Sequence, residues 1–269
     1  MLKHPKPHQM SIRLTLRRMT ATALITTCIF TSGCWDRTEI QDRGMVKALA
    51  VDVVEDDNDP PATQQIENFT QPHGTKQFLL SVELVRLGSG HQQGKGAAES
   101  NTFTVKSRGR SLSEMKRDML GQISKILDFG HMDAIIFSEA ALRQEGLRPL
   151  IDSFLRDPNI RWRIRVYITP GTARSVLEYH TPTGETVGQF LAATATNQTL
   201  NAHMPVARTD LGYITVALDN NGDVILPRVE VAEKVLKIGG GAIFHKDKFA
   251  GYIDEVTVQG WRLASGLVK

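Results

Sequence analysis

The sequence predicts an α+β fold, on the strength of two hydrophobic patterns. Between residues 45 and 179, segments with strand-like alternation are followed by segments whose apolar residues recur at helical spacing. Residues 206–269 contain mainly short strand-like segments separated by turn residues. We therefore expect an N-terminal mixed sheet with flanking helices, followed by a smaller β-rich domain that is incomplete.

The N-terminal 33 residues have the pattern of a signal peptide. Basic residues end at Arg18 and are followed by an apolar stretch of 12 residues, Met19–Phe30. A bilayer-spanning helix needs about 20 residues, so this stretch fits a signal-peptide core better. Small residues at 31–33 then precede Cys34, as in a lipoprotein processing site. We predict that the segment is removed and that lipid on Cys34 holds the mature chain at a membrane.

An ordinary secretory signal with an unmodified cysteine is the alternative, because Thr31 occupies a position that is usually aliphatic.

The signal segment also explains the positive net charge of the chain. The chain carries a formal net charge of +3, but five cations and no acidic residue lie in the first 33 residues. Subtracting these five charges leaves −2 for the rest, so the sequence predicts no nucleic-acid binding.

Three strands are predicted at the start of the folded body. Residues 45–54 are rich in Val and Ala and end at an acidic turn that contains two prolines. Residues 77–87 place Phe78, Leu80, Val82 and Leu84 on one face. A Gly/Gln-rich loop over residues 88–98 then leads to a short strand at 102–106.

The clearest predicted helix begins at Ser111. Ser111 and Glu114 have the spacing of a capping box, in which each side chain accepts a hydrogen bond from a backbone N–H at the helix start. The apolar residues that recur on one side are Leu112, Met115, Met119, Ile123 and Ile126. A strand over 132–137 and helices over 138–144, 147–156 and 172–179 follow.

Arginines alternate with apolar residues in the predicted strand at 161–168. Arg161, Arg163 and Arg165 lie on the face opposite Ile164 and Val166. We interpret the arginines as a solvated face of the sheet. A docking surface for an acidic partner or for anionic lipid headgroups is the alternative.

Four segments are predicted along the chain. They are a signal peptide at 1–33, an N-terminal α/β-layer domain at 34–180, a linker region at 181–205 and a truncated β-rich domain at 206–269. The linker is placed where Thr, Asn and Ala accumulate and periodicity weakens. Strands expected in the last domain cover 213–218, 224–231, 241–245, 249–253 and 261–268.

The sequence predicts no catalytic residue, no cofactor and no metal site. No cysteine follows Cys34, which excludes disulfides and thiolate chemistry from the body. The glycines at 88–96 lack the P-loop spacing, and the histidines form no metal-binding pair. His131 lies between Gly130 and a buried strand, and we expect a structural role in which its ring bonds a backbone carbonyl.

Four stretches of the chain resemble the Ger(x)C family of spore-germination lipoproteins, the C subunits of nutrient germinant receptors. Residues 33–40 (GCWDRTEI) are similar to a signature that follows the lipid-modified cysteine and includes Trp35, Asp36 and Glu39. Gly130-His131 together with 154–161 (FLRDPNIR) is similar to a second block, which includes Arg156, Asp157 and Pro158. Residues 107–118 and 240–261 resemble a helix opening and the start of a C-terminal region.

The resemblance implies a non-enzymatic, lipid-anchored subunit on the outer face of the spore inner membrane. It implies contacts with two polytopic partners, the A and B subunits, and a structural or interaction role for the motif residues. It also implies a further C-terminal domain, which we expect this chain to lack.

Two other classes of protein stay open from the residues alone. A solute-binding lipoprotein that captures a nutrient directly would need a cleft between two comparable lobes. An exported hydrolase would need a cleft with convergent titratable groups, among which His131 is a candidate.

Overall fold

The computed structural model describes residues 16–24, 26, 42–54, 78–86, 101–201 and 209–266. The chain divides into two compact units, 1–40 and 41–269. In the first unit residues 16–24 are helical and exposed. Among the described residues, no helix combines the length and the apolar character needed to cross a membrane. The predicted processing site and Cys34 lie outside the described residues.

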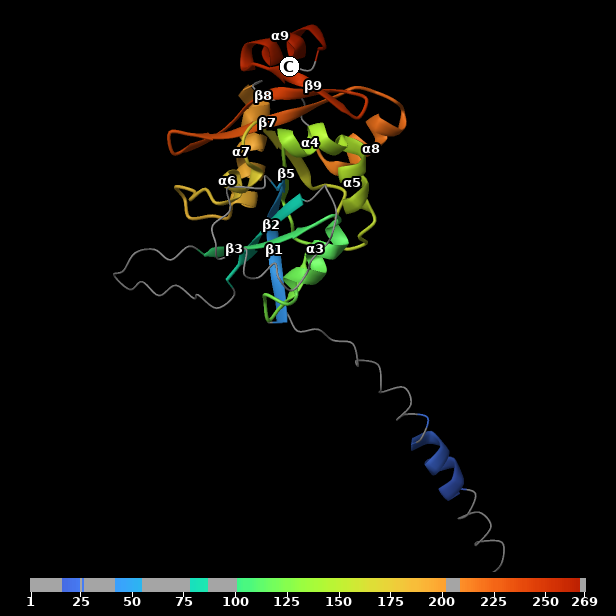
Figure 1. Ribbon diagram of the computed structural model, residues 1–269. Coiled ribbons are helices and arrows are strands. Elements are labelled where there is room, and N and C mark those ends of the chain that lie inside the picture. Colours follow the sequence, from blue (N-terminus) through green and yellow to red (C-terminus); the bar gives the residue numbers. More distant parts are fainter. Residues whose placement is uncertain are drawn as a thin grey trace, which may run out of the picture. The chain divides into compact units, whose positions relative to one another are not determined.

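The second unit is built on one mixed sheet of nine strands (Figure 1). The strands are β1 Arg43–Val53, β2 Phe78–Val85, β3 Thr102–Gly109, β4 Ile126–Asp128, β5 Ala134–Ser138, β6 Arg165–Thr169, β7 Val224–Ala232, β8 Val235–His245 and β9 Lys248–Ile253. Their order is β3-β2-β1-β5-β6-β7-β8-β9, and β4 pairs with β1 beside this path. The neighbours from β1 through β5 and β6 to β7 are parallel, and the outer pairs are antiparallel.

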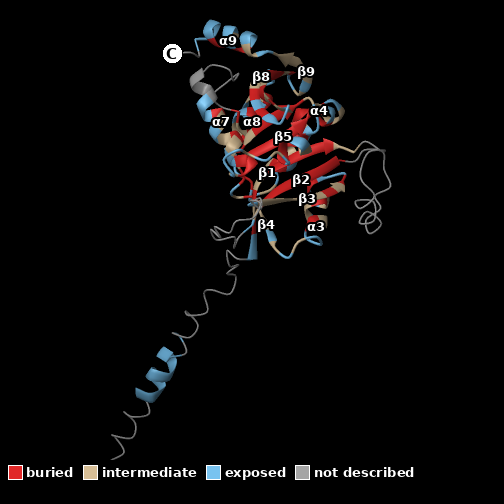
Figure 2. Cartoon of the chain, turned by 90° about the vertical axis from the view of Figure 1, so that its left-hand side faces the viewer, coloured by how far each residue is buried: buried red, intermediate tan, exposed pale blue. Residues whose placement is uncertain are grey.

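Helices cover both faces of the sheet, and the central strands are therefore buried on both sides (Figure 2). On one face lie α3 Leu112–Met119, α4 Glu139–Glu145, α5 Leu147–Leu155 and α8 Leu211–Asp219. On the other face lie α6 Ala173–Leu177 and α7 Val187–Asn201. Helix α9, Glu255–Ala264, contacts β8. This arrangement confirms the predicted α+β class with a mixed sheet and flanking helices.

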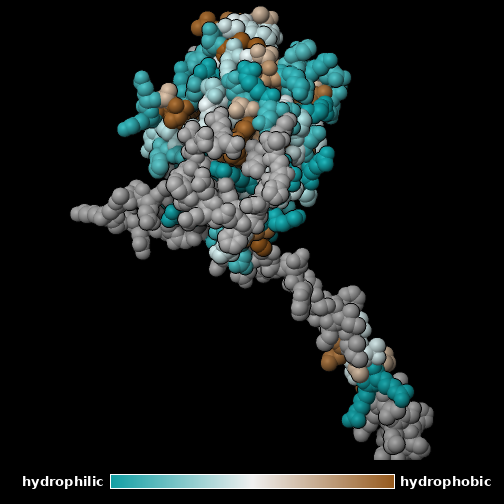
Figure 3. All heavy atoms as spheres, in the orientation of Figure 1, coloured by the Kyte–Doolittle hydropathy of each residue, from teal (hydrophilic) through white to brown (hydrophobic). Residues whose placement is uncertain are grey.

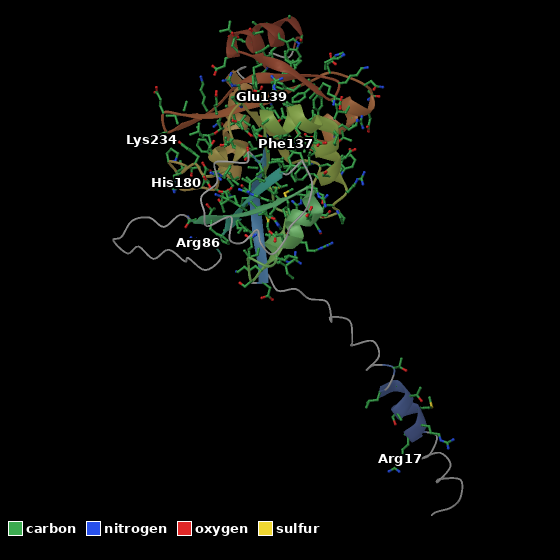
Figure 4. All side chains as sticks on the ribbon, in the orientation of Figure 1. Arg17, Arg86, Phe137, Glu139, His180 and Lys234 are labelled. Atoms are coloured by element: carbon green, nitrogen blue, oxygen red, sulfur yellow. The ribbon has the colours of Figure 1, made fainter. Side chains whose placement is uncertain are left out.

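Alternation along the strands produces the two cores. In β5, Ile135 and Phe137 enter the core under α3, α4, α5 and α8, whereas Ala134 and Ile136 enter the core under α6 and α7. Phe137 packs edge-on against Phe154 of α5, with ring centroids 5.9 Å apart, and Figure 4 shows it inside the body. Small residues on the α6–α7 side let those helices approach the strands closely.

The predicted capping box at Ser111 is confirmed in its first half. The Ser111 hydroxyl accepts a hydrogen bond from the backbone N–H of Glu114, at 3.3 Å. The Glu114 carboxylate accepts from the backbone N–H of Arg110 instead of Ser111, at 3.0 Å. Helix α3 then ends at Met119, and the apolar stripe that continues to Ile126 belongs partly to a turn and to β4.

The predicted linker and separate second domain need correction. Residues 187–201 form α7, and its Val187, Leu191 and Ala195 belong to the core that also contains β1 and β5 residues. Strand β7 joins β6 in the parallel direction, and the core residues of β7 and β8 are shared with the N-terminal strands. The strands after residue 209 therefore extend the same sheet instead of enclosing a core of their own.

Two of the strands predicted in this region are helices. Residues 213–218 belong to α8, which begins where the Asp210 carboxylate accepts the Tyr213 N–H at 2.9 Å. Residues 261–264 belong to α9, which begins in the same way at Asp254. Strands β7, β8 and β9 contain the other three predicted strands.

The predicted arginine-lined strand is also shorter than expected. Arg161 and Arg163 lie in turns before β6, which begins at Arg165. The Arg165 guanidinium donates to the carbonyl of Ala192 and to the hydroxyl of Thr196, both in α7. Trp162 is exposed, whereas Ile164, Val166 and Ile168 enter the core as expected.

Candidate interaction site at the amino edge

The motif residues that the structure describes meet where the parallel strands begin. Ala48 of β1, Ala134 of β5 and Arg165 of β6 are in register. We call the residues that precede this row the amino edge; they comprise residues 43–47, 128–133 and 156–164. Since β1 starts five residues before the row, it projects past the other two strands and pairs there with β4.

A tight turn at Asp128 occupies one part of this edge. The Asp128 carboxylate accepts hydrogen bonds from the Gly130 N–H at 2.8 Å and from the Arg43 guanidinium at 2.9 Å. Partial burial alone would raise the pKa of Asp128, but these two bonds and the charges of Arg43 and His131 hold the pKa below its ordinary value of 3.8. A Cβ on Gly130 would lie 3.0 Å from an Asp128 carboxylate oxygen, so this position favours glycine.

A second carboxylate, Asp157, lies in the loop after α5. It forms an ion pair with Lys116 of α3 and accepts the Asn159 N–H at 3.0 Å. Burial alone would raise the pKa of Asp157, but the bonds from Lys116 and Asn159 outweigh it and lower the pKa. The Lys116 ammonium also lies 4.4 Å from the ring centroid of Phe129, over a ring that is buried.

His131 is exposed, and its contact with the rest of the site is made by its backbone carbonyl. The Lys47 ammonium donates to the His131 carbonyl and to the Asp133 carboxylate, each at 3.3 Å. The backbone N–H of Asp133 in turn donates to the Lys47 carbonyl at 2.8 Å. The predicted hydrogen bond from the His131 ring to a backbone carbonyl is not among the contacts of the described residues.

The structure thus brings together Gly130, His131 and Asp157 from the predicted set. A Cβ added to Gly130 would lie 3.8 Å from the carbonyl oxygen of Asn159, so the two motif blocks lie close together. Arg156 and Pro158 are exposed on the same loop. The remaining predicted residues, Cys34, Trp35, Asp36 and Glu39, lie outside the described residues.

Sequence reasoning missed the cations that complete this site. Lys116 is on a helix that was predicted for its apolar stripe, and Arg43 precedes the first predicted strand. Neither position carries a local signal, because each cation meets its carboxylate only through pairing of β1 with β4 or packing of α3 on the loop.

Two buried carboxylates were also missed, and both hold helix N-termini. Asp52 in β1 accepts the N–H groups of Ala173 and Arg174 in α6, at 2.6 and 2.9 Å. Glu83 in β2 accepts those of Val187 and Gly188 in α7, at 2.8 and 3.1 Å. Burial raises the pKa of both carboxyls despite these bonds. Each of these acidic residues lies within an otherwise apolar strand, and this pattern could have indicated a buried carboxylate with a structural role.

A hollow lies away from the amino edge, between α3 and α5. It has a volume of about 420 Å³ and an apolar floor that includes Val51, Phe78 and Met115. Arg110 and Glu145 bring opposite charges to its lining. A volume of this size holds a small molecule.

The amino edge is suited to binding and positioning rather than to bond breaking. Asp128 and Asp157 are ionised acceptors engaged by cations, so neither is poised as a general acid near neutral pH. Within the described ranges, no group of three His, Cys, Asp or Glu residues is placed to hold a metal ion. Figure 3 shows mainly hydrophilic residues over the described surface on the side that it displays.

Comparison with known proteins gives a consistent family. Residues 36–231 match the model of the family described as spore germination protein N-terminal domain. The matched range includes all of α7 and most of β7, in agreement with the single sheet.

Curated relatives come from Bacillus subtilis (strain 168). The chain is 28% identical over 152 residues to "Putative spore germination protein YfkR", which covers 56% of this chain and 35% of the relative. It is 24% identical to "Spore germination protein KC", covering 60% and 36%, and 23% identical to "Spore germination protein YndF", covering 93% and 62%. The chain thus spans about a third to three fifths of the length of these relatives.

Among solved structures, the crystal structure of the GerBC protein is similar to this chain. The two share 14% identity with a TM-score of 0.42, over 82% of this chain and 57% of the other. Since the family match covers well over half of the sequence, the chain belongs to the spore germination proteins defined by this N-terminal domain.

Proposed function

We propose that this spore germination protein is a lipid-anchored, non-enzymatic subunit of a nutrient germinant receptor. It acts on the outer face of the spore inner membrane through contacts with membrane-embedded A and B subunits. The observation that carries the proposal is the family match over residues 36–231, which begins two residues after Cys34. A tethered binding role also agrees with an amino edge whose carboxylates are engaged in ion pairs.

The first experiment tests the anchor. Spores that carry Cys34→Ala are compared with a deletion strain for membrane fractionation and for germination on single nutrients. We expect the deletion to block a nutrient response, and the substitution to release the protein from the membrane and to weaken the same response by about tenfold or more, since one lost anchor removes most membrane affinity.

The control is Cys28→Ala, which removes the chain's other cysteine from the segment that we expect to be cleaved. This variant should fractionate and germinate like the wild type. Normal germination in both the deletion strain and the Cys34→Ala strain would contradict the receptor role. Loss of the response with the protein still membrane-bound would contradict the lipid anchor alone.

Direct capture of a nutrient is the second candidate, and the hollow between α3 and α5 favours it. An apolar floor with Arg110 and Glu145 nearby would suit a small zwitterion with an apolar side chain. Calorimetric titration of the purified chain with L-leucine tests this candidate. Saturable binding that Arg110→Gln weakens about tenfold would support it, because a charge-assisted hydrogen bond is lost. The control is Arg148→Gln, at a half-exposed arginine that is paired with Asp219. Absence of saturable binding would reject L-leucine as a ligand.

A further inference from the structure

The amino edge carries a local excess of positive charge that internal pairing does not remove. Its three carboxylates are each engaged by a cation: Asp128 by Arg43, Asp133 by Lys47 and Asp157 by Lys116. Three further cations, Arg156, Arg161 and Arg163, are exposed and form no ion pair with any described residue. The rest of the chain after residue 33 has a net negative charge, so this concentration of arginine is not a property of the whole surface.

An exposed tryptophan stands among these arginines. Trp162 is 58% exposed although its indole is the largest apolar side chain of the loop. Its position is fixed, because its carbonyl accepts the Gly212 N–H at 2.9 Å and its ring passes 3.5 Å from the site of a Cβ on Gly212. The loop is therefore tied to α8 while the indole faces outward.

The tether limits where this edge can be. Arg43 at the start of β1 lies nine positions after Cys34, and an extended chain spans at most about 3.6 Å per position, or roughly 30 Å in all. A lipid on Cys34 therefore keeps the start of β1 within about 30 Å of the bilayer surface. The loop at 156–163 lies at the same edge of the sheet as the start of β1.

We propose that Arg156, Arg161, Trp162 and Arg163 form a contact surface for an anionic lipid bilayer. The guanidinium groups pair with lipid phosphates, and the indole enters the headgroup region, where its apolar ring and N–H are both accommodated. The contact orients the body on the membrane, which attachment through one lipid-bearing residue would not do by itself. The inference builds on the proposed anchor at Cys34, but its test uses a chain without lipid.

The test measures binding of the chain from residue 34 with Cys34→Ser to vesicles. Phosphatidylcholine vesicles with and without phosphatidylglycerol are compared by co-sedimentation. We expect binding only to the anionic vesicles, weakening as salt rises from about 0.05 M to about 0.5 M. Each basic residue near an anionic surface contributes about fivefold, so the triple variant R156Q/R161Q/R163Q should bind on the order of a hundredfold more weakly.

A charge-matched triple variant controls for net charge. It carries Arg110→Gln, Lys234→Gln and Lys248→Gln, three exposed cations outside the amino edge, of which Lys234 lies at the β7–β8 turn (Figure 4). This variant should retain most of the binding. Equal losses in both triple variants would overturn the proposal, because binding would then follow net charge alone. Circular dichroism of both variants checks that they are folded.

Trp162 serves as a reporter of where the chain makes contact. With Trp35→Phe and Trp261→Phe, Trp162 is the only tryptophan left in the chain. Its emission should shift to the blue on anionic vesicles and stay unchanged on neutral ones. Bound chain whose Trp162 emission does not shift, or no binding to anionic vesicles at all, would overturn the proposal. In the second case an acidic protein partner becomes the better occupant, while the anchor at Cys34 is unaffected.

Discussion

Lys116 joins two segments of the chain that lie 41 residues apart. Its ammonium pairs with Asp157 and lies over the Phe129 ring, and the two charged side chains are only 24% and 12% exposed. Reduced access to water makes this pair stronger than an exposed one and makes loss of one partner costly. Single residues of this kind hold the two motif blocks of the amino edge together.

At this scale we predict that Lys116→Met destabilises the protein by about 1–2 kcal/mol near neutral pH. The substitution keeps the aliphatic stem but leaves Asp157 without its cation. Because the folded-state pKa of Asp157 is lowered, its contribution is present above its ordinary pKa of 3.8 and is lost as pH falls through the folded-state value. The difference in unfolding free energy between the wild type and Lys116→Met should therefore become smaller in acid. Urea unfolding at several pH values measures this difference.

The control is Arg148→Met, since Arg148 and Asp219 form a more exposed pair, at 41% and 60%. Its cost should stay below about 0.5 kcal/mol. Equal costs for the two substitutions would show that burial does not set the strength of the Lys116–Asp157 pair.

Helices α7 and α8 are the elements in which the structure differs most from what the sequence patterns indicate. Helix α8 contains Tyr213, Ile214, Thr215 and Val216, residue types that favour strands, but Leu211, Ile214 and Leu218 are buried at helical spacing. Helix α7 was interpreted as a linker because its Thr- and Ala-rich sequence has little amphipathic contrast. Gly188 is required there, since a Cβ would lie 2.3 Å from the Lys47 carbonyl oxygen. Tertiary packing overrides local propensity in both helices.

For α7 we predict an unusual pH dependence. Burial raises the pKa of Glu83 above its ordinary value of 4.5 in the folded state, so the folded protein holds the proton more tightly than the unfolded chain. The stability from this group is fully present below about 4.5 and is lost as pH rises through the folded-state pKa. The variant Glu83→Gln, which does not titrate, should gain stability relative to wild type over that rise, by at most about 1.4 kcal/mol per pH unit.

Asp254→Asn at the start of α9 provides the opposite case. Asp254 is an exposed cap whose hydrogen bond from the Thr257 N–H lowers its pKa. Its contribution is therefore lost as pH falls below about 3.8, not as pH rises. Denaturation of each variant and of the wild type at several pH values gives the difference in unfolding free energy as a function of pH. If this difference changed with pH in the same direction for Glu83→Gln as for Asp254→Asn, the assignment of Glu83 as a desolvated cap would be contradicted.

At the scale of the whole molecule, strand pairing determines which residues form the amino edge. Parallel pairing of β1, β5 and β6 places three segments that are remote in sequence at one edge of the sheet. The sequence could indicate that residues 130–131 and 156–158 matter, through their family resemblance. It could not indicate that Arg43 and Lys116 complete the same site, because ion pairs across 41 and 85 residues leave no local pattern.

The sequence by itself determined the α+β class, the strands of the central sheet, the helix at Ser111 and the family, because alternation, capping and motifs are local properties of the chain. Only the tertiary structure decided that strands β1 to β9 pair in one sheet, that α7 belongs to its core, and that Arg156, Arg161 and Arg163 form no ion pair with the described residues. These outcomes depend on which strands pair and which faces become buried. Pairing and burial are set by the free energy of the whole fold and not by any single segment.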